Sequence, residues 1–253
     1  MVTLSESQLV AWLTPLLWPF LRALALFSAM PVLGGRNVPM RVRIGLAGFI
    51  AFAAQASLPE MPLVALDSPV AFMLVAQQVL IGLSLGFAVR VVLAAVEFAG
   101  ELVGLQMGLN FAGFFDPVTA SQGTATARFF ATTVSWLFII MNGHLLIIAA
   151  LVDSFGSFPV GPEPFAFLTK AQPHRWGAEI FSTGLWIALP LIAMLLFVNL
   201  VLGMVSRVAP QINIFAIGFP VTLGVGLVGI LLTLPAMQQP YSMVLDRLLT
   251  QFR

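Results

Sequence analysis

The stretch EFAGELVGLQMGLNFAGFFDPVTASQG, residues 97–123, decides how this chain is organised. It begins with small residues four positions apart, which fall on one face of a helix about one turn from each other. Such a face leaves the backbone bare, so a neighbouring helix can approach closely in apolar surroundings. The predicted helix-packing seam consists of Gly100, Gly104, Gly108 and Ala112.

The same stretch ends in aromatic residues and a helix breaker. Pro117 disfavours helical geometry at Asp116, so we expect the helix to end near Phe115, before the small and polar sequence VTASQGTAT. Phenylalanines at a helix end can fill a core or anchor at a membrane interface, but a deformable apolar loop can also seal a pore by excluding water. We favour the seal because the cluster lies beside a breaker and a flexible loop. The predicted plug residues are Met107, Phe111, Phe114, Phe115, Asp116 and Pro117.

The composition places the chain in a membrane or in a large apolar assembly. Of its 253 residues 60% are hydrophobic and 8% charged, whereas soluble domains carry about 25% charged residues. The net charge is +1 and the basic residues are scattered, which excludes a nucleic-acid footprint. The absence of cysteine excludes disulfides and thiolate chemistry. The first residues, MVTLSESQLV, lack a basic n-region, so we expect no removable signal peptide.

Apolar runs follow one another along the whole chain and predict an all-α, membrane-associated fold of helical hairpins. The second run is shorter than the roughly 20 residues that a transmembrane helix needs. Ser68 and Pro69 form a cap and first-turn pair that opens the third run, and Thr124 or Thr126 opens the fourth. The six predicted runs are 9–33, 44–58, 69–115, 124–152, 179–206 and 212–234.

A polar, proline-rich stretch at 154–177 divides the chain into a larger N-terminal part and a C-terminal hairpin. The loop 34–43 contains three arginines and no acidic residue, so the positive-inside rule assigns it to the cytoplasm.

Five charged residues lie within or beside apolar runs. A charge at the centre of a bilayer costs about 2.5–3.5 kcal/mol, so we expect each to face protein, water or a partner chain. Three of them share nearly one helical face, but two turns of helix separate Arg90 from Glu97 by about 10 Å, too far for a direct pair. A proton relay and structural pairing are both possible, and we favour interhelical or intersubunit pairing. The five residues are Arg22, Arg90, Glu97, Glu101 and Arg128.

The remaining polar residues indicate structure and not catalysis. Asn142, His144 and Asn199 are interpreted as polar contacts between helices. His144 and His174 are far apart and no HExxH motif, nucleophile elbow or phosphate-binding loop is present. We therefore predict no enzyme, no metal and no cofactor.

Two motifs carry a resemblance to a known family. GELVGLQMGLNFAGFFDP (100–117) and FLRALALFSAMPVLGGRNVPMRVRIGLA (20–47), with its R-x-x-x-x-F-x-x-x-P pattern, resemble the FliR/SctT family of type III secretion export-gate proteins. The similarity extends over essentially the whole chain, and long ungapped strings of this kind are specific.

The resemblance implies a non-enzymatic subunit of a flagellar export gate in the bacterial inner membrane. Family members assemble with FliP-type and FliQ-type subunits into a hetero-oligomer raised toward the periplasm, next to FlhB-type and FlhA-type membrane components, and unfolded export substrates pass through it. By this resemblance residues 1–178 are FliP-like, 179–253 form a FliQ-like hairpin with a tail, and the plug maps to 106–122.

Three alternatives remain at this point. An injectisome subunit shares the motif more loosely. A small-solute secondary transporter needs broken helices in two related halves, yet Pro190 and Pro220 have no matching earlier pair. A lipid-embedded scaffold without a pore predicts that the loop 106–122 is insensitive to mutation.

Overall fold

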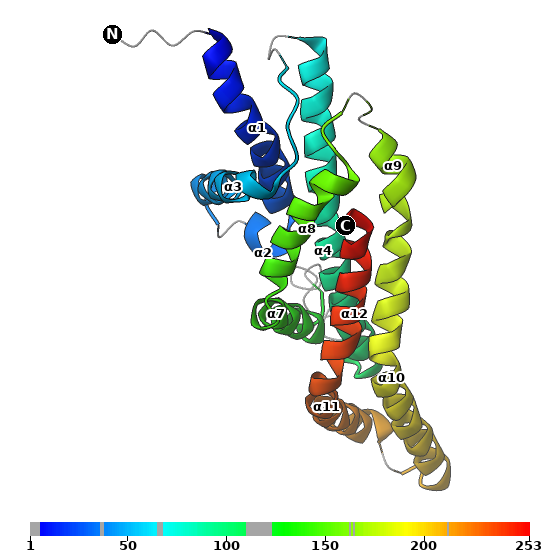
Figure 1. Ribbon diagram of the computed structural model, residues 1–253. Helices are drawn as coiled ribbons and strands as arrows, with labels where there is room; N and C mark the ends of the chain where they lie inside the picture. The colour runs from blue at the N-terminus through cyan, green and yellow to red at the C-terminus, as the bar shows by residue number, and fades with distance from the viewer. Residues whose placement is uncertain are drawn as a thin grey trace. The chain divides into compact units, whose positions relative to one another are not determined.

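The computed structural model describes residues 6–35, 38–64, 68–109, 123–161, 163, 165–211 and 213–253. All regular structure in these ranges is helical, which confirms the predicted all-α class (Figure 1). The α-helices are α1 Glu6–Ala29, α2 Pro31–Gly34, α3 Met40–Ala54, α4 Pro69–Gln106, α7 Ala125–Ile140, α8 Gly143–Ser157, α9 Ala166–Ala171, α10 Gly177–Val208, α11 Ile214–Thr233 and α12 Gln238–Leu249. Short 3-10 turns are η1 Gln55–Ser57, η3 Pro173–Arg175, η4 Leu234–Met237 and η5 Thr250–Phe252.

The chain divides into two compact units by its internal contacts. The first unit comprises Met1–Val91, Phe138–Trp176 and Leu245–Arg253, and the second comprises Val92–Leu137 and Gly177–Val244. The boundary predicted between residues 178 and 179 cannot be compared with this division, because it is based on resemblance to FliP-type and FliQ-type subunits and not on contacts within the chain. It stays a prediction.

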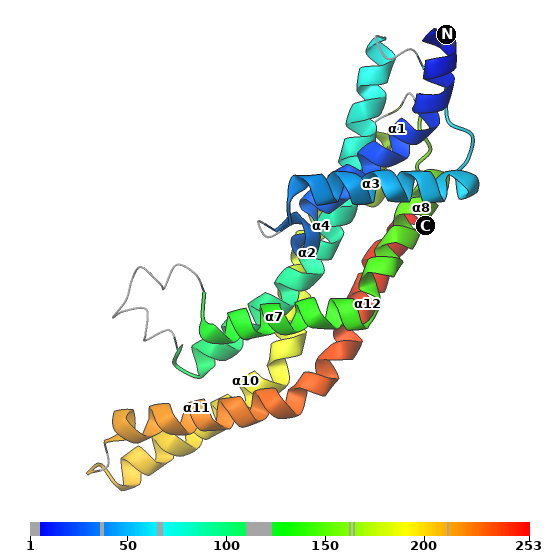
Figure 2. The ribbon, with the colours of Figure 1, turned by 90° about the vertical axis from the view of Figure 1, so that its left-hand side faces the viewer.

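In the first unit, α1 is the central helix. Figure 2 shows α3 lying across it. The N-terminal half of α4 also packs against α1, and glycines make the approach possible. A Cβ added to Gly82 would meet the carbonyl oxygen of Arg22, and one added to Gly86 would lie 2.5 Å from the Cβ of Ala29. The two backbones are therefore in contact where α4 lacks side chains.

The C-terminal residues of the first unit are fastened by aromatic packing. Phe252 is fully buried, and its ring lies 5.8 Å from that of Phe167 and 5.7 Å from that of Trp176. The indole of Trp176 also donates a 3.0 Å hydrogen bond to Gln251. These contacts hold η5 against α9 and Trp176, and η5 also packs on α8 (Figure 1).

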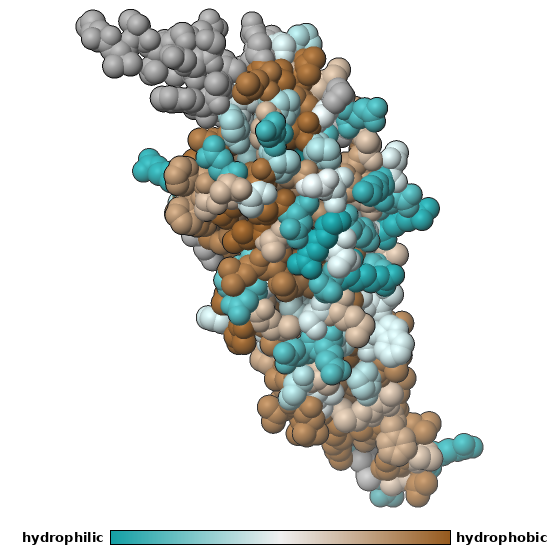
Figure 3. All heavy atoms as spheres, in the orientation of Figure 1, coloured by the Kyte–Doolittle hydropathy of each residue, from teal (hydrophilic) through white to brown (hydrophobic). Residues whose placement is uncertain are grey.

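In the second unit, α10 and α11 form the predicted C-terminal hairpin. The turn ends at Asn213, whose side chain accepts a 3.3 Å bond from the amide of Ala216. On the face drawn in Figure 3, the surface of this hairpin is mostly apolar. Trp186, Phe197 and Leu232 are each more than 60% exposed. A hairpin of this composition needs lipid or another chain around it.

Local signals placed some helix boundaries correctly and others incorrectly. Helix α4 begins at Pro69, and Ser68 Oγ accepts a 3.2 Å bond from the amide of Ala71, as predicted. The run 124–152 was expected to be one helix, but it bends by 67° between α7 and α8. Asn142 lies at the bend with a φ of 55°, a left-handed conformation that asparagine tolerates better than most residues.

Among the residues that the structure describes, three helical segments are long and apolar enough to cross a membrane: Pro69–Gln106, Ala166–Val208 and Ala216–Phe252. The bent pair α7 and α8 makes a fourth if it counts as one span. Within these residues the six apolar runs therefore give fewer than six spans. In particular, α3 has only 15 residues, as expected from its short apolar run.

Candidate functional site

The C-terminal end of α4 and the N-terminal end of α7 lie together in the second unit. The predicted plug loop connects these two helix ends: it follows α4 and precedes α7. We call this place the loop base and define it by Glu101, Gly104, Gly123, Thr124 and Thr126.

The carboxylate of Glu101 links the two sides of the loop base. One oxygen of Glu101 accepts a 3.0 Å hydrogen bond from the backbone amide of Thr124 and a 2.9 Å bond from its hydroxyl. The Thr124 hydroxyl oxygen in turn accepts from the amide of Ala127 at 3.1 Å, so Thr124 caps α7. Glu101 thereby places a negative charge at the N-terminus of α7, where the helix dipole favours it.

Sequence reasoning identified Thr124 as a possible helix start but missed its bonds to Glu101. The contact joins residues 23 positions apart, so neither periodicity nor capping rules could reveal it. The one available signal was the expectation that Glu101, in an apolar helix, needs a partner.

Gly100 and Gly104 let α7 approach α4 at this place. A Cβ on Gly100 would lie 2.9 Å from the Cα of Ala127 and 2.9 Å from the side chain of Phe130. A Cβ on Gly104 would meet the hydroxyls of Thr126 and Thr124. These two glycines of the predicted seam therefore allow α4 and the start of α7 to pack closely at the loop base.

Gly108, the third residue of the predicted seam, lies past the end of α4. We expected a helix to Phe115, but α4 ends at Gln106 and Gly108 has a φ of +79°. The amide of Gly108 bonds to the carbonyl of Leu105 at 3.1 Å, which tightens the last turn. A glycine with positive φ just past a helix end is a common terminator, so Gly108 ends the helix on which the seam was predicted to continue.

Met107 is buried in the second unit. Its side chain packs on α11 in the space left by Gly226, where a Cβ would lie 2.5 Å from the Met107 Cγ. Its carbonyl also accepts a 3.4 Å bond from the hydroxyl of Thr222. Met107 thus attaches the chain to α11 just before the predicted plug residues that follow.

The other predicted plug residues and one seam residue lie outside the described part of the chain. They are Phe111, Ala112, Phe114, Phe115, Asp116 and Pro117.

Arg22 is fully buried in the first unit and is held by neutral groups. Its guanidinium donates to Gln78 Oε1 at 2.8 Å, to Ser154 Oγ at 2.8 Å and to the carbonyl of Phe158 at 2.9 Å. It also stacks 3.6 Å from the ring centre of Phe155. Because Phe158 follows the last turn of α8, the cation lies at the negative end of that helix dipole.

The remaining predicted charges are more exposed. Arg90, Glu97 and Arg128 have exposed side chains, whereas Glu101 is half-buried. Within the described ranges, neither Arg90 nor Glu97 forms an ion pair. The three polar residues read as helix contacts are likewise exposed: Asn142, His144 and Asn199.

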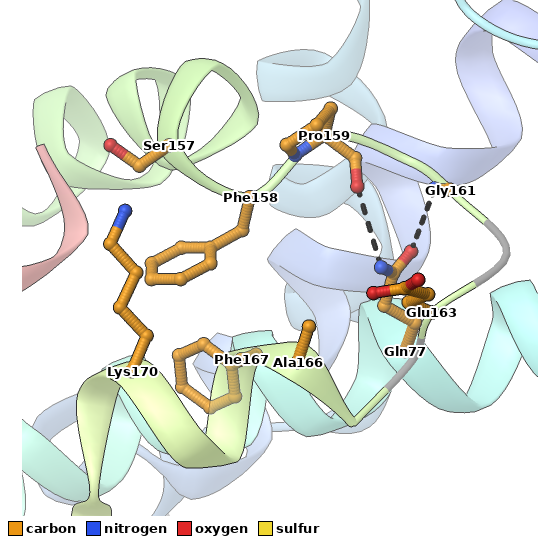
Figure 4. A pocket seen from close by; sticks show the side chains of 9 residues that line it. All are labelled: Gln77, Ser157, Phe158, Pro159, Gly161, Glu163, Ala166, Phe167 and Lys170. Carbon is orange, nitrogen blue, oxygen red and sulfur yellow. Dashed lines mark hydrogen bonds between the residues drawn. The ribbon is translucent and has the colours of Figure 1, made fainter.

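A cavity of about 370 Å³ in the first unit is drawn in Figure 4. Gln77 borders it, donating to the carbonyl of Pro159 at 3.4 Å and accepting from the amide of Gly161 at 3.3 Å. Lys170 reaches over the ring of Phe158 at 4.9 Å. Gln77 and Lys170 thus contact the residues that follow α8, and we interpret the cavity as a structural feature beside these contacts.

A second cavity of about 280 Å³ is lined by apolar residues of α1, α2, α3, α7 and α8 together with His144. Among the described residues, no three histidine or acidic side chains converge as metal ligands would.

The sequence was compared with known protein families. The model of the family described as bacterial export proteins, family 1, matches residues 13–248. That range includes the whole second unit, most of the first unit and the whole loop base.

Curated relatives match over most of their length. A flagellar biosynthetic protein FliR of Escherichia coli K12 is 47% identical over 236 residues, which cover 90% of this chain and 87% of that protein. The protein of the same name from Pectobacterium carotovorum is 43% identical, covering 98% of this chain and 96% of that protein. One from Bacillus subtilis is 32% identical, covering 83% and 82%.

Proposed function

This chain belongs to the bacterial export proteins, family 1, and on that premise we propose that it is a subunit of the flagellar type III protein export gate. In that role it forms one sector of a channel through which unfolded flagellar proteins leave the cytoplasm. The observation that carries the proposal is the 47% identity over 90% of the chain to a protein named for flagellar biosynthesis. The relatives named above are all flagellar, which favours this system over an injectisome.

The exposed apolar surface supports a place among partner chains in the inner membrane. Three segments are long enough to cross a bilayer, while α3 is too short to cross it, although Phe49 and Phe52 are each about 70% exposed. We infer that such surfaces are covered by FliP-type and FliQ-type subunits, with FlhB-type and FlhA-type components nearby. Part of the assembly is then raised out of the bilayer toward the periplasm.

The division into a FliP-like part, residues 1–178, and a FliQ-like hairpin, 179–253, belongs to the same proposal. It is supported by the continuous, mostly exposed helices α10 and α11, which resemble an independent hairpin subunit more than a domain core.

The seal of the channel is assigned to 106–122, with Phe111, Phe114 and Phe115 as its closing side chains. The support comes from their apolar chemistry and from the loop base, which holds both ends of this segment at one place. A constriction lined by phenylalanine excludes water and hence ions.

Co-purification tests the assembly. The tagged chain is expressed with its FliP-type and FliQ-type neighbours, extracted in detergent and imaged as single particles. We expect one stoichiometric particle with a central channel. Recovery of this chain alone as a monodisperse monomer, under conditions that keep the other two together, would contradict the proposal.

Ion leakage tests the seal. Replacing Phe114 and Phe115 with glycine in the assembled complex is expected to raise the passive leak of small ions into energised cells, measured by a membrane-potential dye. An unchanged leak at normal complex abundance would remove the assignment of the seal to these residues.

A further inference from the structure

We propose that the apolar cavity of about 280 Å³ in the first unit binds one anionic phospholipid. One acyl chain of the lipid fills the cavity, and its phosphate contacts Arg43. This role is separate from the export function proposed above, and every residue that lines the cavity lies in the first unit.

The lining of the cavity calls for an apolar occupant. Helices α1, α2, α3, α7 and α8 all contribute to it, mostly with aliphatic side chains, and His144 is the only polar residue among those that line it. A water molecule in a cavity needs two to four polar partners, so water does not fill this space stably. Leu46 is 37% exposed and His144 is exposed as well, so the cavity can be reached from outside the chain.

Arg43 lies at one end of this cavity. It precedes Leu46 by one turn of α3 and Ile50 by two turns, so the three residues share one helical face, and the last two line the cavity. The Nη2 of Arg43 donates to the carbonyl of Gly35 at 2.7 Å and to that of Val38 at 3.1 Å. These carbonyls follow α2, which forms another wall of the cavity.

The charge of Arg43 has no counterion in the described part of the chain. Arg43 forms no ion pair there, and its Nε is buried without a hydrogen-bond partner. The two carbonyls accept hydrogen bonds but do not neutralise the guanidinium. A phosphate group supplies both acceptor oxygens and negative charge, in a geometry that suits arginine.

A phospholipid is the occupant that meets both requirements at once. An apolar side chain from a partner subunit would fill the cavity but leave Arg43 without an anion, and an acidic one would pair with Arg43 but leave the cavity empty. The loop 34–43 is predicted to face the cytoplasm, and the cytoplasmic leaflet carries anionic lipids. We therefore commit to a lipid whose net charge is negative.

The phosphate contact should decide which lipid binds. An acyl chain gains little when it moves from a bilayer into the cavity, because both surroundings are apolar. One arginine close to an anionic lipid strengthens its binding by about five-fold. We expect the loss of Arg43 to weaken binding by about that factor.

Native mass spectrometry tests the proposal on the purified full chain with the subunits that accompany it, after lipid has been removed in detergent. The complex is titrated with dioleoyl phosphatidylglycerol. Dioleoyl phosphatidylcholine tests the net charge of the headgroup, dioleoylglycerol tests the chains alone, and inorganic phosphate tests the anion alone. We expect one phosphatidylglycerol molecule to bind more tightly than any of these three probes. Equal binding of dioleoylglycerol would overturn the proposal.

Two pairs of variants locate the bound lipid. Arg43→Gln removes the charge and Ile50→Phe fills the cavity, and each should weaken phosphatidylglycerol binding by about five-fold or more. Arg41→Gln is the control for charge, because Arg41 is exposed about 200° around α3 from Arg43. Ile44→Phe is the control for volume, because Ile44 is 44% exposed and does not line the cavity. Both controls should bind like the unchanged chain.

Equal binding by all four variants would show that the lipid belongs to the general shell around the complex, and it would overturn the proposal. Equal weakening by Arg41→Gln and Arg43→Gln would also overturn it. Single-particle imaging of the unchanged complex with the lipid gives a result even if a variant does not assemble. Elongated density in the cavity that leads to Arg43 supports the lipid, whereas an empty cavity or a partner's side chain there excludes it. These measurements do not involve ion leak, so the lipid site and the proposed seal can fail independently.

Discussion

Helix α4 carries two pairs of glycines at the same spacing, and the two pairs meet different kinds of neighbour. Gly82 and Gly86 face the backbone and alanines of α1, within the first unit. Gly100 and Gly104 face the first turns of α7 within the second unit, where Gly100 meets Ala127 and Phe130 and Gly104 meets the hydroxyls of Thr124 and Thr126. The first pair joins two helices along their length, whereas the second brings one helix against the end of another.

The difference between the two pairs of glycines predicts different costs of substitution. A helix backbone cannot move aside without shifting the whole helix, so the first pair should tolerate no side chain. At Gly104 the nearest atoms belong to threonine side chains, which can change rotamer, so a substitution there should cost less than one at Gly82 or Gly86. The same GxxxG spacing thus has two meanings on one helix, and the neighbour decides which applies.

The largest effect is expected from Gly82→Leu. The added side chain would run into the carbonyl of Arg22 and the Cβ of Ala25, which lies 2.8 Å from the position of a Cβ. We expect a cost of about 3 kcal/mol or more, the upper end for overpacking, and loss of the chain from the detergent extract. Gly156→Ala is the control, since nothing lies within 4 Å of that position. Equal recovery of both variants would show that the first seam is not closely packed.

Arg22→Lys should rank second. Lysine keeps the charge, but one ammonium cannot serve three acceptors that are arranged for a planar guanidinium. We expect destabilisation of about 2 kcal/mol, because buried acceptors lose charged donors. Thermal unfolding of the purified complex measures it. A melting temperature equal to that of the unchanged chain would mean that the neutral acceptors do not select arginine.

Gly104→Ala should cost less, about 1–2 kcal/mol, because its nearest neighbour is the rotatable hydroxyl of Thr126. A double-mutant cycle with Thr126→Ala should show a favourable coupling of at least about 0.5 kcal/mol, since the second change makes room for the first. Thermal unfolding of the four proteins gives the coupling. Strict additivity would place the strain elsewhere than between these two residues.

Thr124→Ser should have the smallest effect, within about 0.5 kcal/mol. Serine keeps the hydroxyl that bonds to Glu101 and to the amide of Ala127, and it is at least as good a cap as threonine. The melting temperature should stay near that of the unchanged chain, whereas Thr124→Val, which removes the hydroxyl, should lower it. A drop in Thr124→Ser as large as that in Thr124→Val would show that the methyl group, and not the hydroxyl, matters.

Much of the fold was predictable because apolar runs and local caps act over short distances. The hairpin of α10 and α11 and the start of α4 at Pro69 followed from composition and capping alone. The bend at Asn142 and the early end of α4 did not. Asparagine and glycine are compatible with a helix interior as well as with a left-handed residue, and only packing selects one conformation.

The candidate site was predicted in part for the same reason. The sequence identified Gly100, Gly104 and Glu101 as unusual in an apolar helix, but it did not reveal that Gly108 adopts a positive φ past the helix end. The partners Thr124, Gln78 and Ser154 are brought to their charges by tertiary contacts across 23 to 132 positions. No local pattern contains that information.

By itself the sequence determined an all-helical, membrane-associated chain, because its apolar residues are too many for a wetted surface and its helix signals are local. It also determined the family, through motifs long enough to be specific. Only the tertiary structure decided which neighbour each glycine meets and which acceptor each buried charge finds. Those choices depend on contacts between distant segments, where close packing and the cost of an unpaired polar group leave few arrangements.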